Sequence, residues 1–426
     1  MKNYFIILIV LITTFTKAQI VNIPDANFKN ALVNTLCVDT NGDGIFDDDA
    51  DINNDGEIQV SEAEAVINLW VYNNNIVSME GIQSFSNLEY LHCMSNQISF
   101  LDVTQNLNLT ILKCHDNQLS NLDVTQNVNL ETLAIGSNNL TEIDVSQNEN
   151  LKGLSCPNNM LSNLDFTQNT NLTVIFCQSN QLASLDLSQN PNLVTFVGYN
   201  NLLSELDVSQ NTNLITLWVS DNQLISLTIS QNSIIEQIFC SNNQLTNLEV
   251  SQCQNLKSIN FDNNQIINSD LSQNPNLEEV LAFENQLTSL NINNGNNINL
   301  TRMISYNNPN LECIQVDDEI YSNNQVCSFP LGGWCKDDTA QYSEECILGI
   351  ESNLSPTFTI YPNPIQNTIS ISTTGQIETV KIYSLQGQLL KESTNTTLDV
   401  SSLSSGVYFI QVLIEGKIIT KKIVKL

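Results

Sequence analysis

The chain has 426 residues, and 45 acidic residues against 14 lysines and arginines give it a formal net charge of −31. Between Gln19 and Ser355 only six residues are basic: Lys29, Lys113, Lys152, Lys257, Arg302 and Lys336. Because a phosphate backbone requires a basic footprint on its partner, this composition excludes nucleic-acid binding by that region. After the N-terminus no stretch is apolar enough to cross a bilayer, so we expect no transmembrane segment.

Residues 1–18 have the features of a secretory signal peptide. Lys2 supplies the positive charge, Phe5–Phe15 is apolar, and Thr16–Ala18 offers small residues before a cleavage point at Gln19. The apolar run is too short to span a bilayer comfortably. We therefore predict Sec export with removal of this segment, and an anchored N-terminus is the alternative.

Residues 19–65 are expected to cap the structure that follows. Pro24 and Asp25 precede an amphipathic pattern made by Phe28, Leu32 and Leu36. This arrangement predicts a short helix with proline near its first turn. The helix would cover the apolar end of the first coil of a repeat.

The second half of this cap contains two clusters of oxygen-bearing side chains. Asp51–Glu62 fits the twelve-residue calcium loop of the EF-hand pattern, with Gly56 at its sharp turn. A preceding partial set has Ala50 at its twelfth position, so that loop is either weaker or borrows Asp49. Structural calcium is the expected cofactor, and a merely acidic linker is the alternative. The predicted ligands are Asp51, Asn53, Asp55, the carbonyl of Glu57, Gln59 and Glu62, with Asp39, Asn41, Asp43 and Asp47 in the partial loop.

A unit of 21 residues recurs over residues 66–311, and its clearest landmark is LDVTQN at Leu101–Asn106. A fixed period of this length predicts a solenoid, in which each unit buries its apolar face against its neighbours. The alternation around Leu112 and Cys114 predicts a short strand with one buried face. An asparagine then turns the chain, and its amide would satisfy backbone groups inside the bend. Stacked coils would place these amides in a ladder: Asn74, Asn96, Asn117, Asn138, Asn159, Asn180, Asn201, Asn222, Asn243, Asn264 and Asn285.

The spacing L-x-x-L-x-C-x-x-N-x-L at Leu109–Leu119 resembles that of the leucine-rich repeat family. The resemblance implies a right-handed, mainly β solenoid, and we predict about twelve coils from Leu69–Val71 to Met303–Ser305. The second half of each unit has the same spacing as the first. We therefore predict a parallel sheet on one face and short strands on the other, with a 3₁₀ turn or an irregular strand at the LDVSQN segment as the alternative.

The 11 cysteines fall into two groups, apart from Cys37 and Cys253, which we expect to be unpaired. One group replaces the buried leucine of the strand and forms a single column: Cys93, Cys114, Cys156, Cys177 and Cys240. In a dry core without adjacent histidines, these thiols are expected to pack as small hydrophobes rather than to bind metal. The second group lies in a cap over residues 312–349. Its predicted disulfides are Cys313–Cys346 and Cys327–Cys335, although spacing alone does not determine connectivity.

After a linker at residues 350–356, residues 357–426 form a separate and more basic domain. Its predicted strands are Phe358–Tyr361, Ile369–Ser372, Val380–Tyr383, Leu389–Glu392, Val407–Ile414 and Lys417–Val424. Motifs at Tyr361–Pro364, Leu385–Leu389, Ser405–Tyr408 and Lys421–Lys425 resemble the C-terminal sorting domain of the type IX secretion system of Bacteroidetes. The resemblance implies a small β-sandwich that engages that secretion machinery, followed by release or surface attachment. An ordinary adhesion module is the alternative.

The expected functional residues lie on the outward face of the predicted sheet. One outward column reads from His92 to Ile304 and places large apolar side chains on four successive coils. An exposed aromatic stripe with an acidic rim is typical of a binding surface. We expect a non-catalytic, secreted or cell-surface protein that holds a protein or a glycan there, or alternatively a structural stalk with calcium at its base. The expected ligand-binding residues are Phe176, Val197, Tyr199, Trp218 and Phe239.

Catalytic residues are not apparent in the sequence. His92 and His115 are the only histidines, and we place them one coil apart in one outward column beside Lys113. No serine or cysteine nucleophile with a paired base accompanies them. Two exposed polar residues on a sheet are the simpler interpretation, and an enzymatic role is the third alternative.

Overall fold

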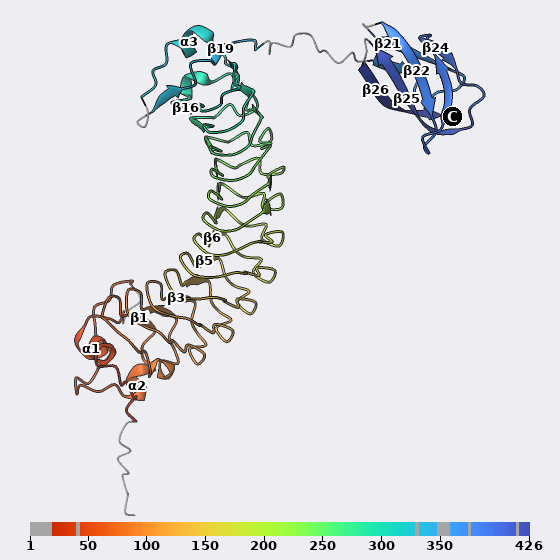
Figure 1. Ribbon diagram of the computed structural model, residues 1–426. Coiled ribbons are helices and arrows are strands. Elements are labelled where there is room, and N and C mark those ends of the chain that lie inside the picture. Colours follow the sequence, from red (N-terminus) through yellow and green to blue (C-terminus); the bar gives the residue numbers. More distant parts are fainter. Residues whose placement is uncertain (1–18, 40–42, 329–331, 347–357, 374–375, 415–416) are drawn as a thin grey trace, which may run out of the picture. The chain divides into compact units, whose positions relative to one another are not determined.

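The computed structural model describes residues 19–39, 43–328, 332–346, 358–373, 376–414 and 417–426 (Figure 1). The predicted signal peptide at residues 1–18 lies outside these ranges. The chain divides into two compact units, residues 1–346 and residues 347–426. Within the described ranges, no helix combines the length and the apolar character needed to cross a membrane.

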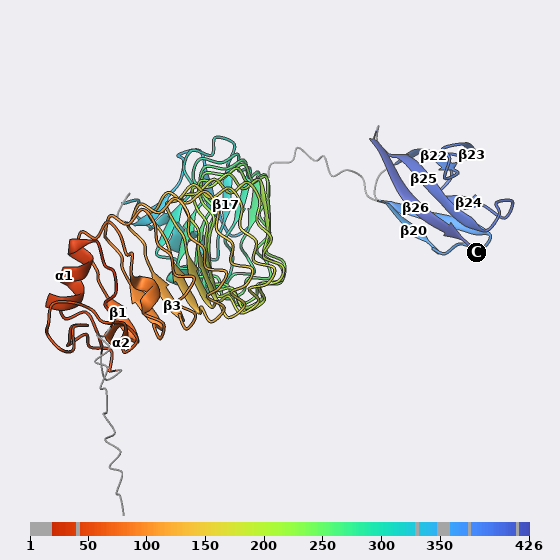
Figure 2. The same cartoon turned by 90° about the horizontal axis from the view of Figure 1, so that it is seen from below.

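The first unit is a solenoid of stacked coils that runs from α1 and β1 to α3 and β19 (Figure 1). Figure 2 views the stack from below, where successive coils overlap. One face is a parallel sheet of 13 strands, of which the last, β18 (Gly333–Cys335), comes from the C-terminal cap. The other twelve come one from each coil, as the repeat predicts. They are β1 (Asn68–Trp70), β2 (Tyr90–His92), β3 (Ile111–Lys113), β4 (Thr132–Ala134), β5 (Gly153–Ser155), β6 (Val174–Phe176), β7 (Thr195–Val197), β9 (Thr216–Trp218), β11 (Gln237–Phe239), β12 (Ser258–Asn260), β14 (Glu279–Leu281) and β16 (Arg302–Ile304).

The opposite face has strands only in the later coils, so the prediction of short strands there holds for part of the solenoid. A two-stranded sheet joins β8 (Glu205–Asp207) to β10 (Ser226–Thr228). A four-stranded sheet contains β13 (Asn268–Asp270), β15 (Ser289–Asn291), β17 (Cys313–Gln315) and β19 (Gln341–Ser343). In the earlier coils the segment is irregular. Along both the earlier and the later coils, buried asparagine side chains also join neighbouring coils. The Asn148 amide, for example, donates to the carbonyls of Val124 at 2.9 Å and Asn127 at 2.8 Å.

The predicted asparagine ladder is present beneath the sheet edge. Asn159 donates to the carbonyls of Ile135 at 3.0 Å and Cys156 at 3.2 Å, and its oxygen accepts from the Leu140 amide at 3.0 Å. The residue before each ladder asparagine has a positive φ of 51–57°, which makes the turn tight. The ladder extends one coil further than predicted, to Asn308.

Helix α1 (Ala26–Asn34) caps the N-terminal end and buries Phe28 and Leu32. The Asp25 carboxylate accepts from the Phe28 amide at 2.9 Å and also from the Val77 amide at 2.8 Å, which ties the helix to the first coil. The expectation for Leu36 was wrong, because the helix ends two residues earlier and leaves this side chain 68% exposed. The short elements of the ends are α2 (Val60–Ala63), η1 (Ile82–Ser84), η2 (Asn297–Asn299) and α3 (Glu319–Asn323).

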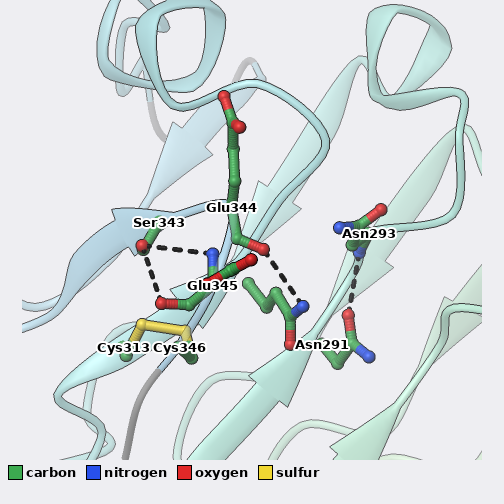
Figure 3. Close-up of a disulfide and its surroundings, with 8 residues drawn as sticks. Asn291, Asn293, Cys313, Ser343, Glu344, Glu345 and Cys346 are labelled. Carbon is green, nitrogen blue, oxygen red and sulfur yellow. Dashed lines mark hydrogen bonds between the residues drawn. A yellow bond between two sulfur atoms is a disulfide. The ribbon is translucent and has the colours of Figure 1, made fainter.

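Both predicted disulfides are present in the C-terminal cap, Cys313–Cys346 and Cys327–Cys335. Figure 3 shows Cys313–Cys346 beside the turn formed by Ser343–Glu345. The first bond joins β17 to the chain just after its neighbouring strand β19. Cys37 and Cys253 are unpaired, as expected.

The second unit contains two antiparallel sheets around one apolar core. All six predicted strands are present, together with a seventh, β24, that was not predicted. The first sheet contains β20 (Phe358–Tyr361), β21 (Thr368–Thr373) and β24 (Thr397–Asp399). The second contains β22 (Ile377–Tyr383), β23 (Leu389–Ser393), β25 (Gly406–Ile414) and β26 (Lys417–Lys425).

Candidate binding face and calcium loops

The predicted aromatic column follows the strand register of the large sheet. Phe176 on β6 pairs with Val197 on β7, Val197 pairs with Trp218 on β9, and Trp218 pairs with Phe239 on β11. Neighbouring strands lie about 4.8 Å apart, so the four side chains form one row across the coils. Tyr199 lies two residues beyond Val197 at the edge of this row.

The rings of this row contact one another. The ring centroids of Tyr199 and Trp218 lie 4.7 Å apart, and those of Trp218 and Phe239 lie 5.7 Å apart. Trp218 is 40% exposed, whereas Val197 is only 7% exposed because larger neighbours stand on both sides. Trp218 therefore supplies more exposed surface than Val197 does. We call this group the aromatic stripe: Phe176, Val197, Tyr199, Trp218 and Phe239.

A polar track continues from Tyr199 beside the stripe. On the next two coils the hydroxyl of Ser241 donates to that of Ser220 at 2.9 Å, and Asp262 occupies the coil after that. Phe283 follows and stacks on Tyr306, with ring centroids 5.1 Å apart. The track thus places two hydroxyls and a carboxyl group between aromatic side chains.

A second aromatic group lies on the first coils and was not predicted. Trp70 on β1 stacks on His92 of β2, with centroids 5.3 Å apart, and Phe46 meets Trp70 edge-on at 4.9 Å. Tyr90 lies under the Lys113 ammonium, 5.5 Å from the ring centroid. The sequence signal was present, because Trp70 lies in the predicted strand core Leu69–Val71 and in the same outward column as His92.

The two histidines are not in one column, which corrects the sequence-based placement. His92 pairs with Lys113 across β2 and β3, whereas His115 lies two residues beyond Lys113. Their ring centroids are 6.3 Å apart. Burial, followed by the nearby Lys113 charge, lowers the pKa of His92 to about 4, so this ring is neutral at physiological pH.

The predicted twelve-residue calcium loop, Asp51–Glu62, has its predicted side chains gathered around one turn. The Asp51 carboxylate accepts from the amides of Asp55 at 3.1 Å and Gly56 at 2.7 Å. The side-chain amide of Gln59 donates to the Asp55 carboxylate at 3.0 Å, so the two side chains lie together. Glu62 is buried, and its two oxygens accept from the amides of Asn53 at 3.1 Å and Gln59 at 2.9 Å. Carboxylate and amide oxygens with a glycine at φ 84° fit a hard cation.

The partial loop repeats the first part of this geometry. Asp39 accepts from the Gly44 amide at 3.0 Å, and Asp43 accepts from the Ile45 amide at 2.8 Å. Asn41 lies outside the described residues. In the part of the chain that the structure describes, no group of three or more His, Cys, Asp or Glu side chains is arranged so that it could hold a metal ion.

The column of repeat cysteines is buried in the solenoid core. Burial raises the pKa of Cys93 and Cys156 to about 12, so both remain thiols at neutral pH. A thiol is a far weaker nucleophile and metal ligand than a thiolate. The column therefore acts in packing.

Several solved structures share the solenoid fold. The functional domain of InlJ from Listeria monocytogenes, described as including a cysteine ladder, is 22% identical, with 87% of this chain and 93% of that chain covered at a TM-score of 0.57. The internalin InlF from Listeria monocytogenes is 21% identical, with 71% and 93% covered at 0.51. A TDR receptor is 21% identical, with 60% and 52% covered at 0.54. The comparison with curated proteins gave no match.

These likenesses and the repeat geometry define the first unit as a leucine-rich repeat solenoid. The second unit indicates how the protein is secreted. Residues 359–426 match the model of the secretion system C-terminal sorting domain family. The chain is therefore a leucine-rich repeat protein sorted by type IX secretion to the extracellular space or the outer-membrane surface.

Proposed function

We propose that the protein is a non-catalytic binding protein that holds a partner protein on the large parallel sheet. The aromatic stripe is the observation that carries this proposal. Soluble proteins expose few contiguous aromatic surfaces without a partner, and tryptophan and tyrosine are enriched among residues that dominate binding energy. The acidic surface around the stripe would form the polar rim of the interface.

The stripe is tested by removing its two central rings. In Trp218→Ala and in Phe239→Ala, affinity for the partner should fall by about tenfold or more each, since a truncated interface anchor costs about 1–2 kcal/mol or more. The thermal midpoint should change little, because both side chains point away from the core. Binders are first selected on the full chain from a random peptide display library and a glycan array, and affinities are then measured by calorimetry.

The matched control is Ser226→Ala on the opposite face, which should leave affinity unchanged. Unchanged affinity in both ring variants would remove the stripe from the interface. A ligand found only on the glycan array, and lost in the Trp218 variant, would keep the site but change its ligand class.

The calcium loops support a second role at the base of the solenoid, and we propose that Asp51–Glu62 binds a structural calcium ion. The loop joins the cap at two places. Its Glu57 pairs with Lys29 of α1 at 2.6 Å, and the amide of Val21 donates to Ile58 at 2.8 Å. An ion in this loop would fix the helix and the segment around Val21 against the first coil.

Calcium removal should lower stability. At about 100 times the dissociation constant, a ligand that binds only the folded state adds about 2.7 kcal/mol, so EDTA should lower the thermal midpoint by several degrees. Asp55→Asn keeps the shape of its side chain but should weaken calcium binding by about tenfold, while Glu64→Gln outside the loop should not. Equal thermal midpoints with calcium and with EDTA in the unchanged protein would contradict the site.

A further inference from the structure

The Asp262 side chain is almost completely buried in the binding face. Its residue is 7% exposed, and it stands between Ser241 and Phe283 in the polar track. Its side chain hydrogen-bonds with that of Asn260, which faces Phe239 across the sheet. Buried carboxylates are normally paired with a cation, because their ionised form loses the solvation of water.

The cations of the solenoid are engaged elsewhere, and among the described ion pairs none includes Asp262. Four of the six basic residues between positions 19 and 355 pair with glutamates, at 2.6–2.8 Å. Of the other two, Lys113 lies over Tyr90 on the first coils and Lys336 donates to the Ala340 carbonyl. The pairs are Lys29–Glu57, Lys152–Glu131, Lys257–Glu236 and Arg302–Glu279.

The surroundings of Asp262 are negative as well as apolar. Burial, and then the charges of Glu284 and Asp221, raise its pKa to about 6 against the opposing hydrogen bond from Asn260. The nearby Cys240 thiol stays protonated, because burial raises its pKa far above neutral. The ionised carboxylate is thus poorly stabilised by the chain itself.

We propose that the binding face takes a protein segment that brings a lysine or arginine to Asp262, while apolar neighbours in that segment cover Trp218 and Phe239. The aromatic faces would hold the cation and its alkyl stem, and the carboxylate would neutralise its charge. A net charge of −31 favours encounter with a basic partner. This inference rests on the proposed function and specifies the chemistry of the ligand.

The test uses peptides selected on the full chain from a random display library. Selected peptides should be enriched in lysine or arginine beside aliphatic or aromatic residues. A synthetic peptide in which glutamine replaces the basic residue should bind the unchanged protein at least about tenfold more weakly. Asp262→Asn should lower affinity for the basic peptide by the same factor, and it should leave affinity for the glutamine peptide unchanged.

A stability measurement separates this role from a structural one. The pKa of Asp262 in the folded protein lies above the ordinary aspartate value of 3.8, so ionisation costs stability above about pH 6 and costs none below about pH 4. Asp262→Asn should therefore raise the thermal midpoint at pH 8 and leave it unchanged at pH 4. A carboxylate that held the fold together would instead give a lower midpoint at pH 8.

Asp186→Asn on the opposite face also removes one negative charge. It should change neither the affinity for the basic peptide nor the affinity for the glutamine peptide. The inference would be overturned by selected peptides without basic residues or by glycan binding alone. It would also be overturned if Asp262→Asn bound the basic peptide as tightly as the unchanged protein does. If the Trp218 variant still loses affinity, the proposed function stands while this inference fails. If neither variant loses affinity, both fail.

Discussion

Replacing the Cys313–Cys346 disulfide by Cys313→Ala and Cys346→Ala is expected to lower the free energy of unfolding of the solenoid by about 4 kcal/mol. The bond closes a segment of 33 residues, and a cross-link of that length removes this much conformational freedom from the unfolded chain. The segment contains α3 and β18, and its end follows β19 at the edge of the second-face sheet. Urea denaturation followed by circular dichroism measures the loss.

The second disulfide provides the matched comparison. Cys327–Cys335 closes only 8 residues, so its double alanine variant should lose less, about 2.5 kcal/mol. Hydrogen exchange should locate the effect of the first variant in β17 and β19, whose amides form the last ladder of the sheet. Losses of equal size in the two variants, or exchange that speeds up only in the first coils, would contradict this account of the cap.

Asn159→Ala is expected to lower the free energy of unfolding by about 3 kcal/mol. The side chain is buried, donates to the carbonyls of Ile135 and Cys156 and accepts from the Leu140 amide. Alanine removes these hydrogen bonds and leaves the Leu140 amide without its partner, whereas the two carbonyls still accept from Asn138 and Asn180. Each unsatisfied buried group costs about 1–3 kcal/mol. Asn159→Asp should also destabilise, because a carboxylate does not donate to the carbonyls of Ile135 and Cys156.

Asn163 is the control, since it lies on the surface of the same coil. Asn163→Ala should change the free energy of unfolding by no more than about 0.5 kcal/mol. Urea denaturation of the three variants beside the unchanged protein measures the effect. If Asn159→Ala were as harmless as Asn163→Ala, the ladder would be a consequence of the fold rather than a source of its stability.

Most of the solenoid was predictable because the repeat length is constant. A period of 21 residues returns each strand, turn and ladder asparagine to one place, so counting positions gives the register. Two features were missed in coils whose length changes. The coil that contains Trp70 has one extra residue and the coil before Asn308 has two; the strands of both coils were predicted, but the aromatic group at one end and the ladder asparagine at the other were not.

The order of the side chains along the binding face could be predicted from the sequence, but their exposure could not. The order follows from the repeat, whereas exposure depends on the size of neighbouring side chains, and Val197 is nearly covered for this reason. The pKa of Asp262 depends on the charges of Asp221 and Glu284, which lie on two other coils. Its place in the acidic rim was visible in the sequence, but the lack of an ion pair among the described residues required the structure.

Site-specific photo-cross-linking tests most directly that the large sheet, rather than the opposite face, holds the ligand. A benzoylphenylalanine is placed at Gln237 beside Phe239, or at Ser226 on the opposite face, in the full chain. Both positions are exposed and lie at the first residue of a strand. With a selected basic peptide, we predict a covalent adduct at position 237 and none at position 226. An adduct at position 226 with none at position 237 would contradict the account.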